Sequence, residues 1–302
     1  MQYENVFIRG DGQMNISTQQ DIIAVSAGRE NVVALKKDGT VISSDSCIAL
    51  SSRGSSDIWT DIVAISAGGY GTLGLKKDGS VVYAGYFPYK IYEKHVVGIS
   101  KGFDYYVVIR ENGTVKTSDS ALVGDGVSRW NDIIAVSAGG SHIVGMKKDG
   151  TVVAVGKNGI GRYSEFRDLG QCDVSSWEEI TEVSAGDNHT VGLKRNGTVV
   201  AVGSNTFSQC AVSDWNDIVS VATGDTFTIG LKKDGTVVTA GGYDCTGRLY
   251  APFLNEVRSW TDIIAISAET FHVVGIKKDG SVVVAKTCGP HEKCDVSDWK
   301  LF

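Results

Sequence analysis

The chain has little proline and no long apolar run. It contains 3 Pro among 302 residues but 37 Gly, so it turns through glycine rather than through rigid proline corners. No stretch approaches the roughly 18 apolar residues of a membrane helix. The first residues, MQYENVFIRG, lack the apolar core of a signal peptide. We therefore expect no membrane contact and a cytoplasmic location, or secretion if a leader was removed.

An excess of positive charge is also missing. Lys and Arg number 29 against 35 Asp and Glu, which gives a formal net charge of -6. Bulk attraction to nucleic acid or to anionic lipid is therefore not expected. Apolar residues make up 42% and charged residues 21% of the chain, as in a globular protein with a sizeable core. Disordered, collagen-like and coiled-coil classes are excluded.

One sequence unit recurs along the whole chain. It reads DIIAVSAGGSHIVGMKKDGTVVAVG from Asp132. Such a unit, repeated with a period near forty residues, is typical of propeller blades. The seven copies start at Asp21, Asp61, His95, Asp132, Glu179, Asp217 and Asp262.

Each unit contains the signals of antiparallel strands. An Asp-Gly or Asn-Gly pair such as Asp149-Gly150 stands between β-branched runs and predicts a type I′ hairpin. Apolar residues at alternate positions, such as Val144 and Met146, indicate one buried face. Gly145 between them is matched by a small residue in all copies but one, as expected where neighbouring sheets approach closely. A fourth, outer strand is expected at segments such as GQCDVSSW, SQCAVSDW and EKCDVSDW.

The repeats predict an all-β fold. A four-stranded antiparallel unit cannot bury both faces alone, and radial closure of seven units leaves only short, protected edges. We predict a single domain over residues 1–302, a seven-bladed β-propeller of four-stranded blades. Residues 1–20 are expected to close the ring by pairing with the C-terminal segment. An open solenoid is the alternative, but the ends lack polar capping repeats.

The repeat resembles the regulator of chromosome condensation repeat family over nearly all of residues 5–302. The resemblance rests on the order of its parts: SAG, a variable loop often with His, an apolar strand, KKDG and VVAVG. The style is similar to uncharacterised bacterial members and, distantly, to propeller-type β-lactamase inhibitory proteins. The resemblance implies a seven-bladed propeller. It implies no single function, because family members include a nucleotide exchange factor, a photoreceptor and enzyme inhibitors.

Residues able to carry chemistry stand at repeat positions. All six Trp fall two residues before an inner strand, which indicates a structural role. His142, His189 and His272 share another register, where we expect each to bond its own turn. No triad, Walker loop, HExxH motif or acid pair stands out. We therefore expect no enzyme activity, no catalytic residue, no cofactor and no metal.

The cysteines fit reduced thiols. Cys172, Cys210 and Cys294 lie at one register on different blades, too far apart to bridge one another. Cys288 and Cys294 flank His291, and this segment leaves open a local disulfide or a poor metal site. Since two Cys and one His fall short of a zinc set, we expect free thiols, which fit the cytosol.

Basic pairs precede the hairpin turns. Acidic residues of the same turns and of the inner-strand starts offset them, leaving about one net positive charge on this face. We expect solvated salt bridges there rather than a nucleic-acid platform.

The opposite face holds the variable loops after each SAG and after each VVAVG. Rigid scaffolds place binding in such loops, and aromatic residues are favoured interface anchors. We predict a monomeric, non-enzymatic interaction scaffold that binds a protein partner here, although several rings could instead only cover blade ends. The predicted anchors are Tyr70, Phe87, Tyr89, Phe103, Asp104, Tyr243, Tyr250, Phe253 and Phe271.

Three other functions remain open. Inhibitors of β-lactamase in the family carry an aromatic in most repeats at the register of Ser141, where this chain has only Tyr70 and Phe271. Nucleotide exchange on a small GTPase would need a projecting wedge, and no interval is long enough for one. Glycan binding would use the same loop aromatics together with Asp and Asn.

Overall fold

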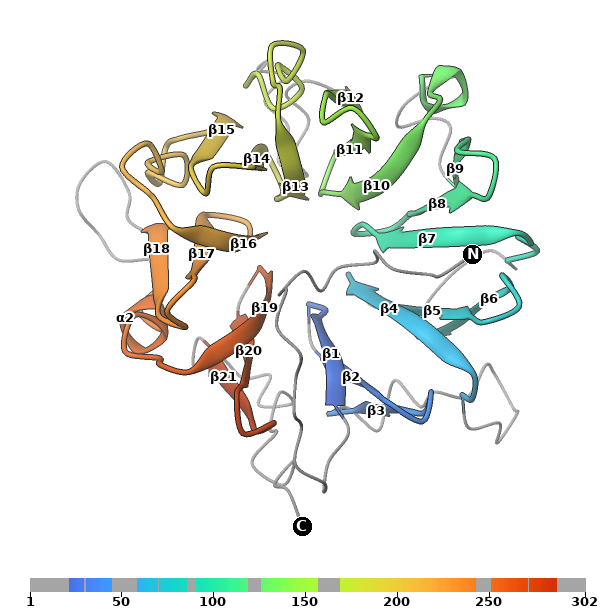
Figure 1. The fold of residues 1–302 in the computed structure, drawn as a ribbon, viewed down its shortest axis with the longest axis horizontal. Coiled ribbons are helices and arrows are strands. Elements are labelled where there is room, and N and C mark those ends of the chain that lie inside the picture. The colour runs from blue at the N-terminus through green and yellow to red at the C-terminus, as the bar shows by residue number, and fades with distance from the viewer. Residues whose placement is uncertain are drawn as a thin grey trace.

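The computed structural model describes residues 22–29, 31–44, 59–69, 71–85, 91–118, 126–156, 169–242, 251–270 and 272–286. These ranges form seven three-stranded antiparallel sheets arranged around a common centre (Figure 1). The arrangement is all-β and consistent with a seven-bladed propeller, so the predicted fold class is confirmed at this level.

Each sheet, here called a blade, is built from three consecutive strands. Blades one to three are β1 (Ile22–Ala27), β2 (Val32–Lys36), β3 (Val41–Ser43); β4 (Ile62–Gly68), β5 (Gly71–Lys76), β6 (Val81–Gly85); β7 (Val96–Lys101), β8 (Tyr106–Arg110), β9 (Val115–Thr117). Blades four and five are β10 (Ile133–Ala138), β11 (His142–Lys147), β12 (Val152–Gly156); β13 (Ile180–Ala185), β14 (His189–Lys194), β15 (Val199–Gly203). Blades six and seven are β16 (Ile218–Thr223), β17 (Phe227–Lys232), β18 (Val237–Gly241); β19 (Ile263–Glu269), β20 (His272–Lys277), β21 (Val282–Lys286).

Helical structure is confined to two short turns in the described ranges. They are the 3-10 helix η1 (Val127–Arg129) and the α-helix α2 (Leu254–Val257). Neither is long enough to cross a membrane.

The hairpin turns differ from the predicted type I′. In blade one, Lys36 N–H donates to Thr40 O, Gly39 N–H donates to Lys36 O, and Gly39 has φ 81°. Asp38 is not among the residues with positive φ. The loop is thus a type I turn followed by a left-handed glycine bulge. The Asp38 carboxylate accepts both the N–H and the hydroxyl of Thr40, which explains the Asp-Gly-Thr order.

The predicted fourth strand is wrong where it can be checked. Residues 169–179 and 204–217 form turns, held by bonds such as Trp177 N–H to Val174 O at 2.9 Å. These turns place Val174 and Trp177 in the core between blades four and five. The segment EKCDVSDW and residues 1–20 lie outside the described residues, so the pairing of the chain ends stays a prediction.

Tryptophan rings fill the seams between blades. Trp177 packs with Met146 of the preceding blade and lies on Gly192 of its own blade. A Cβ on Gly192 would be 2.7 Å from the indole Cζ3, so this glycine is required by the ring rather than by the approach of a neighbouring sheet. The five described pairs are Trp59–Gly74, Trp130–Gly145, Trp177–Gly192, Trp215–Gly230 and Trp260–Gly275. The predicted structural role of these tryptophans is confirmed.

The serine of the SAG motif links neighbouring blades at the other end of the inner strands. Ser26 Oγ of blade one accepts the N–H of Ala67 in blade two at 2.9 Å. Ser267 of blade seven accepts the N–H of Ala27 in blade one at the same distance. The first and last described sheets therefore lie side by side. Equivalent bonds join Ser66 to Lys101, Ser100 to Ala138 and Ser137 to Ala185.

The acidic residue that begins most units has a backbone role. Asp61 has φ 60°, a left-handed conformation that Asp tolerates better than most residues. It lets the next residue, Ile62, donate its N–H to Gly39 O of the preceding hairpin at 3.0 Å. The salt bridges predicted for this face are absent from most of the described hairpin turns: the ion pairs found there lie in or beside blade three.

The histidines bond the next blade rather than their own turn. His142 is fully buried, and its Nε2 lies 2.7 Å from Thr190 Oγ1 of blade five. Thr190 donates its own proton to Gln171 O at 2.7 Å, so Nε2 carries the imidazole proton. His189 and Thr228 repeat this pair one blade further on. The structural role expected for this register is confirmed, and the bonding partner is corrected.

The Trp–Gly contact can be tested by a double-mutant cycle on Trp177 and Gly192. We expect Gly192→Val to lower the free energy of unfolding by about 2 kcal/mol because the new methyls collide with the indole. With Trp177→Ala in place, the same change should cost clearly less. Urea unfolding of the four proteins measures the coupling, and strict additivity of the two single effects would contradict the contact.

A second prediction concerns acid sensitivity. Burial lowers the pKa of His142 to about 4, of His189 to about 3 and of His272 to about 4. The unfolded chain therefore binds more protons below about pH 6.5, and stability should fall from there to about pH 4, by up to about 1.4 kcal/mol per pH unit for each histidine. Burial raises the pKa of Glu182 to about 7, which opposes this fall between about pH 7 and 4.5.

The matched variant is His142→Asn. Asn31 occupies the same register in blade one and donates its side-chain N–H to Thr72 at 3.3 Å, so asparagine fits this position. Urea midpoints at pH 7 and pH 5 should show a smaller loss for the variant than for the natural chain. An equal loss in both proteins would show that His142 is not a source of the acid sensitivity.

Candidate functional site

Charged side chains from several blades gather where the inner strands end on the loop face. Lys101 closes β7 in blade three, Arg29 follows β1, and Glu269 closes β19. Asp104 follows β7, and Asp225 follows β16. We call these five residues the central cluster, because their charges act on one another across blades one, three, six and seven.

Lys101 is the buried member of the central cluster. Its side chain is 6% exposed, and its Nζ donates to Gly102 O at 2.8 Å and to Phe103 O at 3.0 Å. Burial lowers the pKa of Lys101 to about 8, although Asp104 and Glu269 favour its charged form. The ammonium group therefore holds the turn after β7 in place and carries a positive charge into the centre of the face.

Two acidic members of the central cluster, Asp225 and Glu269, repel one another. Burial raises the pKa of Asp225, the nearby charge of Glu269 raises it further, and Arg29 lowers it. Glu269 also accepts the N–H of Thr270. Two carboxylates with one arginine beside them leave negative charge that a cation from outside could neutralise.

Two predicted anchors lie within this region. The guanidinium of Arg29 sits 5.1 Å from the centroid of the Phe103 ring, a cation–π contact. Phe103 is half-buried and Asp104 is exposed. Arg29 also donates its backbone N–H to Gly69 O at 3.2 Å, which ties the loops of blades one and two together. The structure thus brings Phe103 and Asp104 together with charged residues that sequence reasoning did not select.

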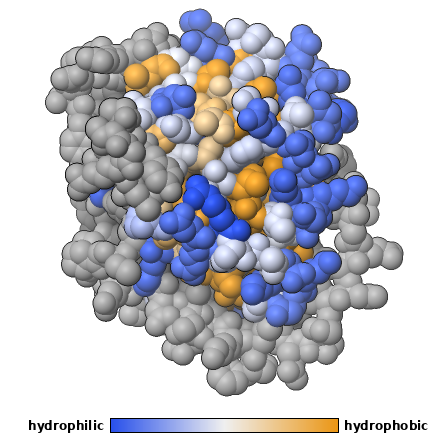
Figure 2. All heavy atoms as spheres, turned by 90° about the vertical axis from the view of Figure 1, so that its left-hand side faces the viewer, coloured by the Kyte–Doolittle hydropathy of each residue, from blue (hydrophilic) through white to orange (hydrophobic). Residues whose placement is uncertain are grey.

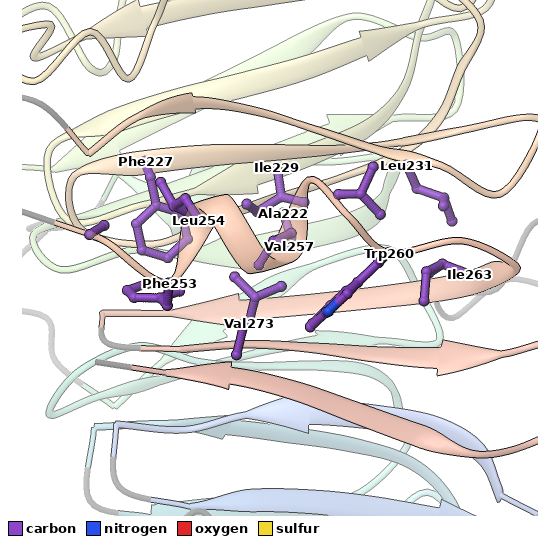
Figure 3. Packing of buried hydrophobic residues seen from close by; sticks show 13 residues of the cluster. Ala222, Phe227, Ile229, Leu231, Phe253, Leu254, Val257, Trp260, Ile263 and Val273 are labelled. Atoms are coloured by element: carbon purple, nitrogen blue, oxygen red, sulfur yellow. The ribbon is translucent and has the colours of Figure 1, made fainter. Parts of the chain in front are cut away.

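A third predicted anchor, Phe253, belongs to the core. Its side chain is 5% exposed and meets Phe227 edge to face, with centroids 5.4 Å apart and planes at 82°. The ring lies near Phe227 of blade six and beside Val273 of blade seven (Figure 3). The ring covers a blade end and is not presented to a partner. The other six predicted anchors, Tyr70, Phe87, Tyr89, Tyr243, Tyr250 and Phe271, lie outside the described residues and stay predictions.

Other chemistry is sparse in the described ranges. They hold no group of three or more His, Cys, Asp or Glu able to bind a metal ion. Cys172 and Cys210 are free thiols, as predicted, and burial raises the pKa of Cys210 to about 11. On the outer side seen in Figure 2, apolar atoms are scattered among hydrophilic ones rather than joined in one patch.

Comparison with known repeats and proteins agrees with the fold. Residues 133–161 and 180–209 match the repeat described as Regulator of chromosome condensation (RCC1) repeat. No curated protein matches the chain.

Several solved structures are similar in three dimensions. The CRINKLY WD40 ectodomain of the Arabidopsis thaliana receptor kinase ACR4 has TM-score 0.62 and 15% identity, over 90% of this chain and 99% of that one. The ectodomain of the Physcomitrella patens receptor kinase CR4 has TM-score 0.67 and 19% identity, over 90% and 75%. Human WBSCR16 has TM-score 0.58 and 14% identity, over 90% and 88%. At these identities the likeness is one of fold, a β-propeller, and two of its repeats match the RCC1 repeat.

Proposed function

We propose that this propeller is a non-enzymatic scaffold that binds a protein partner through its loop face, centred on the central cluster. The observation that carries the proposal is the meeting of Arg29, Lys101 and three acids from four different blades. Such a site exists only when the blades are assembled, so it presents one rigid pattern of charge to a partner.

The composition of the site favours a protein ligand. Arginine and aromatic residues are enriched among the residues that dominate binding energy, and Arg29 and Phe103 are already held together. A positioned pair loses little side-chain entropy when a partner docks. The site therefore offers a preorganised contact at its centre.

The charges specify the partner further. Arg29 and Lys101 are two cations against three acids, so the central cluster has one net negative charge. The raised pKa of Asp225 reflects burial and the nearby charge of Glu269. A lysine or arginine of the partner placed beside these two acids would relieve their repulsion. We propose a partner that inserts a basic side chain into the cluster.

Affinity capture from the source organism tests the proposal. The natural chain, the double variant Asp225→Asn/Phe103→Ala and a control variant Lys148→Ala are immobilised in parallel. Lys148 is exposed in the hairpin turn of blade four, at the opposite end of the strands. We expect one protein to be retained by the natural chain and the control, and its dissociation constant to rise at least tenfold for the double variant.

Two further readings sharpen the result. Binding should weaken as the pH falls and Asp225 takes up a proton, at a higher pH than an ordinary aspartate because burial and Glu269 raise its pKa. Thermal unfolding of each variant checks that the fold is kept. Equal affinity of the folded double variant and the natural chain would overturn the proposed site.

A further inference from the structure

Blade three departs from the repeat at three linked positions. Glu93 stands where five other blades have the seam tryptophan, two residues before the unit begins. Val108 stands where those blades have the glycine beneath the indole, and it pairs across β8 and β9 with Lys116. In the five tryptophan blades the glycine pairs with Val82, Val153, Val200, Val238 or Val283. The Trp–Gly–Val group is therefore replaced as a unit by Glu–Val–Lys.

The replacement forms an ion cluster at the seam between blades two and three. Glu93 is 7% exposed, its Oε1 lies 2.6 Å from Lys116 Nζ, and its Oε2 lies 3.1 Å from Arg110 Nη2. Burial by itself would raise the pKa of Glu93, but hydrogen bonds from Lys116 and Arg110 outweigh it and lower the pKa. The carboxylate is thus ionised and holds two cations in fixed positions.

A cavity of about 660 Å³ opens beside this ion cluster. Tyr106, which is buried, forms part of its wall, while Tyr92, at 78% exposure, stands at its rim. Arg110 and Lys116 also line it. The volume lies within the range of small-ligand sites.

The cavity is a positive region on an acidic protein. Its lining includes Lys94, Arg110 and Lys116 against Glu93 and Glu111, one net positive charge. The side chains of Arg110 and Lys116 are 40% and 52% exposed, so both reach the open space. Arg110 meets Glu93 through Nη2, and a guanidinium has five N–H donors arranged to fork around a carboxylate. An anion is therefore the complementary ligand.

We propose that this cavity binds a small organic carboxylate that carries an aromatic ring. The carboxylate would meet Arg110 and Lys116, and the ring would lie against the tyrosines of the wall and rim. Ring stacking on tyrosine adds to the area buried. A free aromatic acid and the aromatic C-terminal residue of a peptide share this chemistry.

The chain supplies its own matched controls. Six other blades carry lysine at the register of Arg110, so Arg110→Lys keeps the charge and the fold but removes the fork. The triple variant Glu93→Trp/Val108→Gly/Lys116→Val rebuilds the seam of the other blades and removes Lys116 from the cavity wall. Its melting temperature should not fall below that of the natural chain.

Calorimetric titration with three probes tests the proposal. Indole-3-propionate has both ring and carboxylate, indole-3-propionamide lacks the charge, and propionate lacks the ring. We expect the first to bind at least tenfold more tightly than the others. Arg110→Lys should weaken it about tenfold and the triple variant should abolish it. A tripeptide Gly-Gly-Trp, with and without a C-terminal amide, separates the two sources of ligand.

Each contrary result has a defined meaning. No heat from indole-3-propionate at millimolar concentration overturns the proposal, as does equal affinity for propionate. Unchanged binding by the folded triple variant would place the ligand elsewhere. If that variant does not fold, the Arg110→Lys comparison decides alone. None of these measurements depends on the partner proposed for the loop face.

Discussion

The packing of an indole on a bare glycine sets the spacing of the blades. In the seam before blade five, Trp177 lies on Gly192 and packs against Met146 of blade four, so one ring joins two sheets. A ring of blades closes only if its seams have compatible thickness. Hydrogen bonds between neighbouring blades then fix their alignment. The SAG serines make these bonds at one end of the inner strands, and carbonyl groups of the hairpin turns make them at the other end. Ring and glycine are absent together in blade three, as this constraint requires.

The sequence repeat predicts most of the fold, because its period and its strand patterns are local. It does not predict contacts between residues about forty positions apart. His142 appeared to belong to its own turn, but its partner, Thr190, lies on the next blade. The hairpin type was misjudged for a different reason: the Asp38 side chain bonds forward to Thr40 and favours a type I turn over the mirror-image turn.

The candidate site was only partly visible in the sequence. Aromatic residues in loops predicted a binding face, and Phe103 lies on it, whereas Phe253 folds back onto Phe227 because covering a blade end buries more apolar area. Lys101 was missed. The one sign of this residue in the sequence is SKG in place of SAG in the third copy. Since lysine is rarely buried, its residue type alone does not predict a buried position. The charges that act on it come from other blades, which only the assembled ring brings near.

Both sites discussed above involve blade three, and this follows from how a propeller is built. Its stability is close to a sum over blades and seams, so regular seams elsewhere can offset one irregular blade. Blade three lacks the indole–glycine contact. It also carries two buried charged side chains, Lys101 at the loop face and Glu93 at the seam with blade two. Buried charge is costly unless it is paired, and both residues have polar partners. The change at Glu93 is accompanied by matched changes at Val108 and Lys116. Blade three is therefore a specific feature of the molecule and not a damaged copy of the repeat.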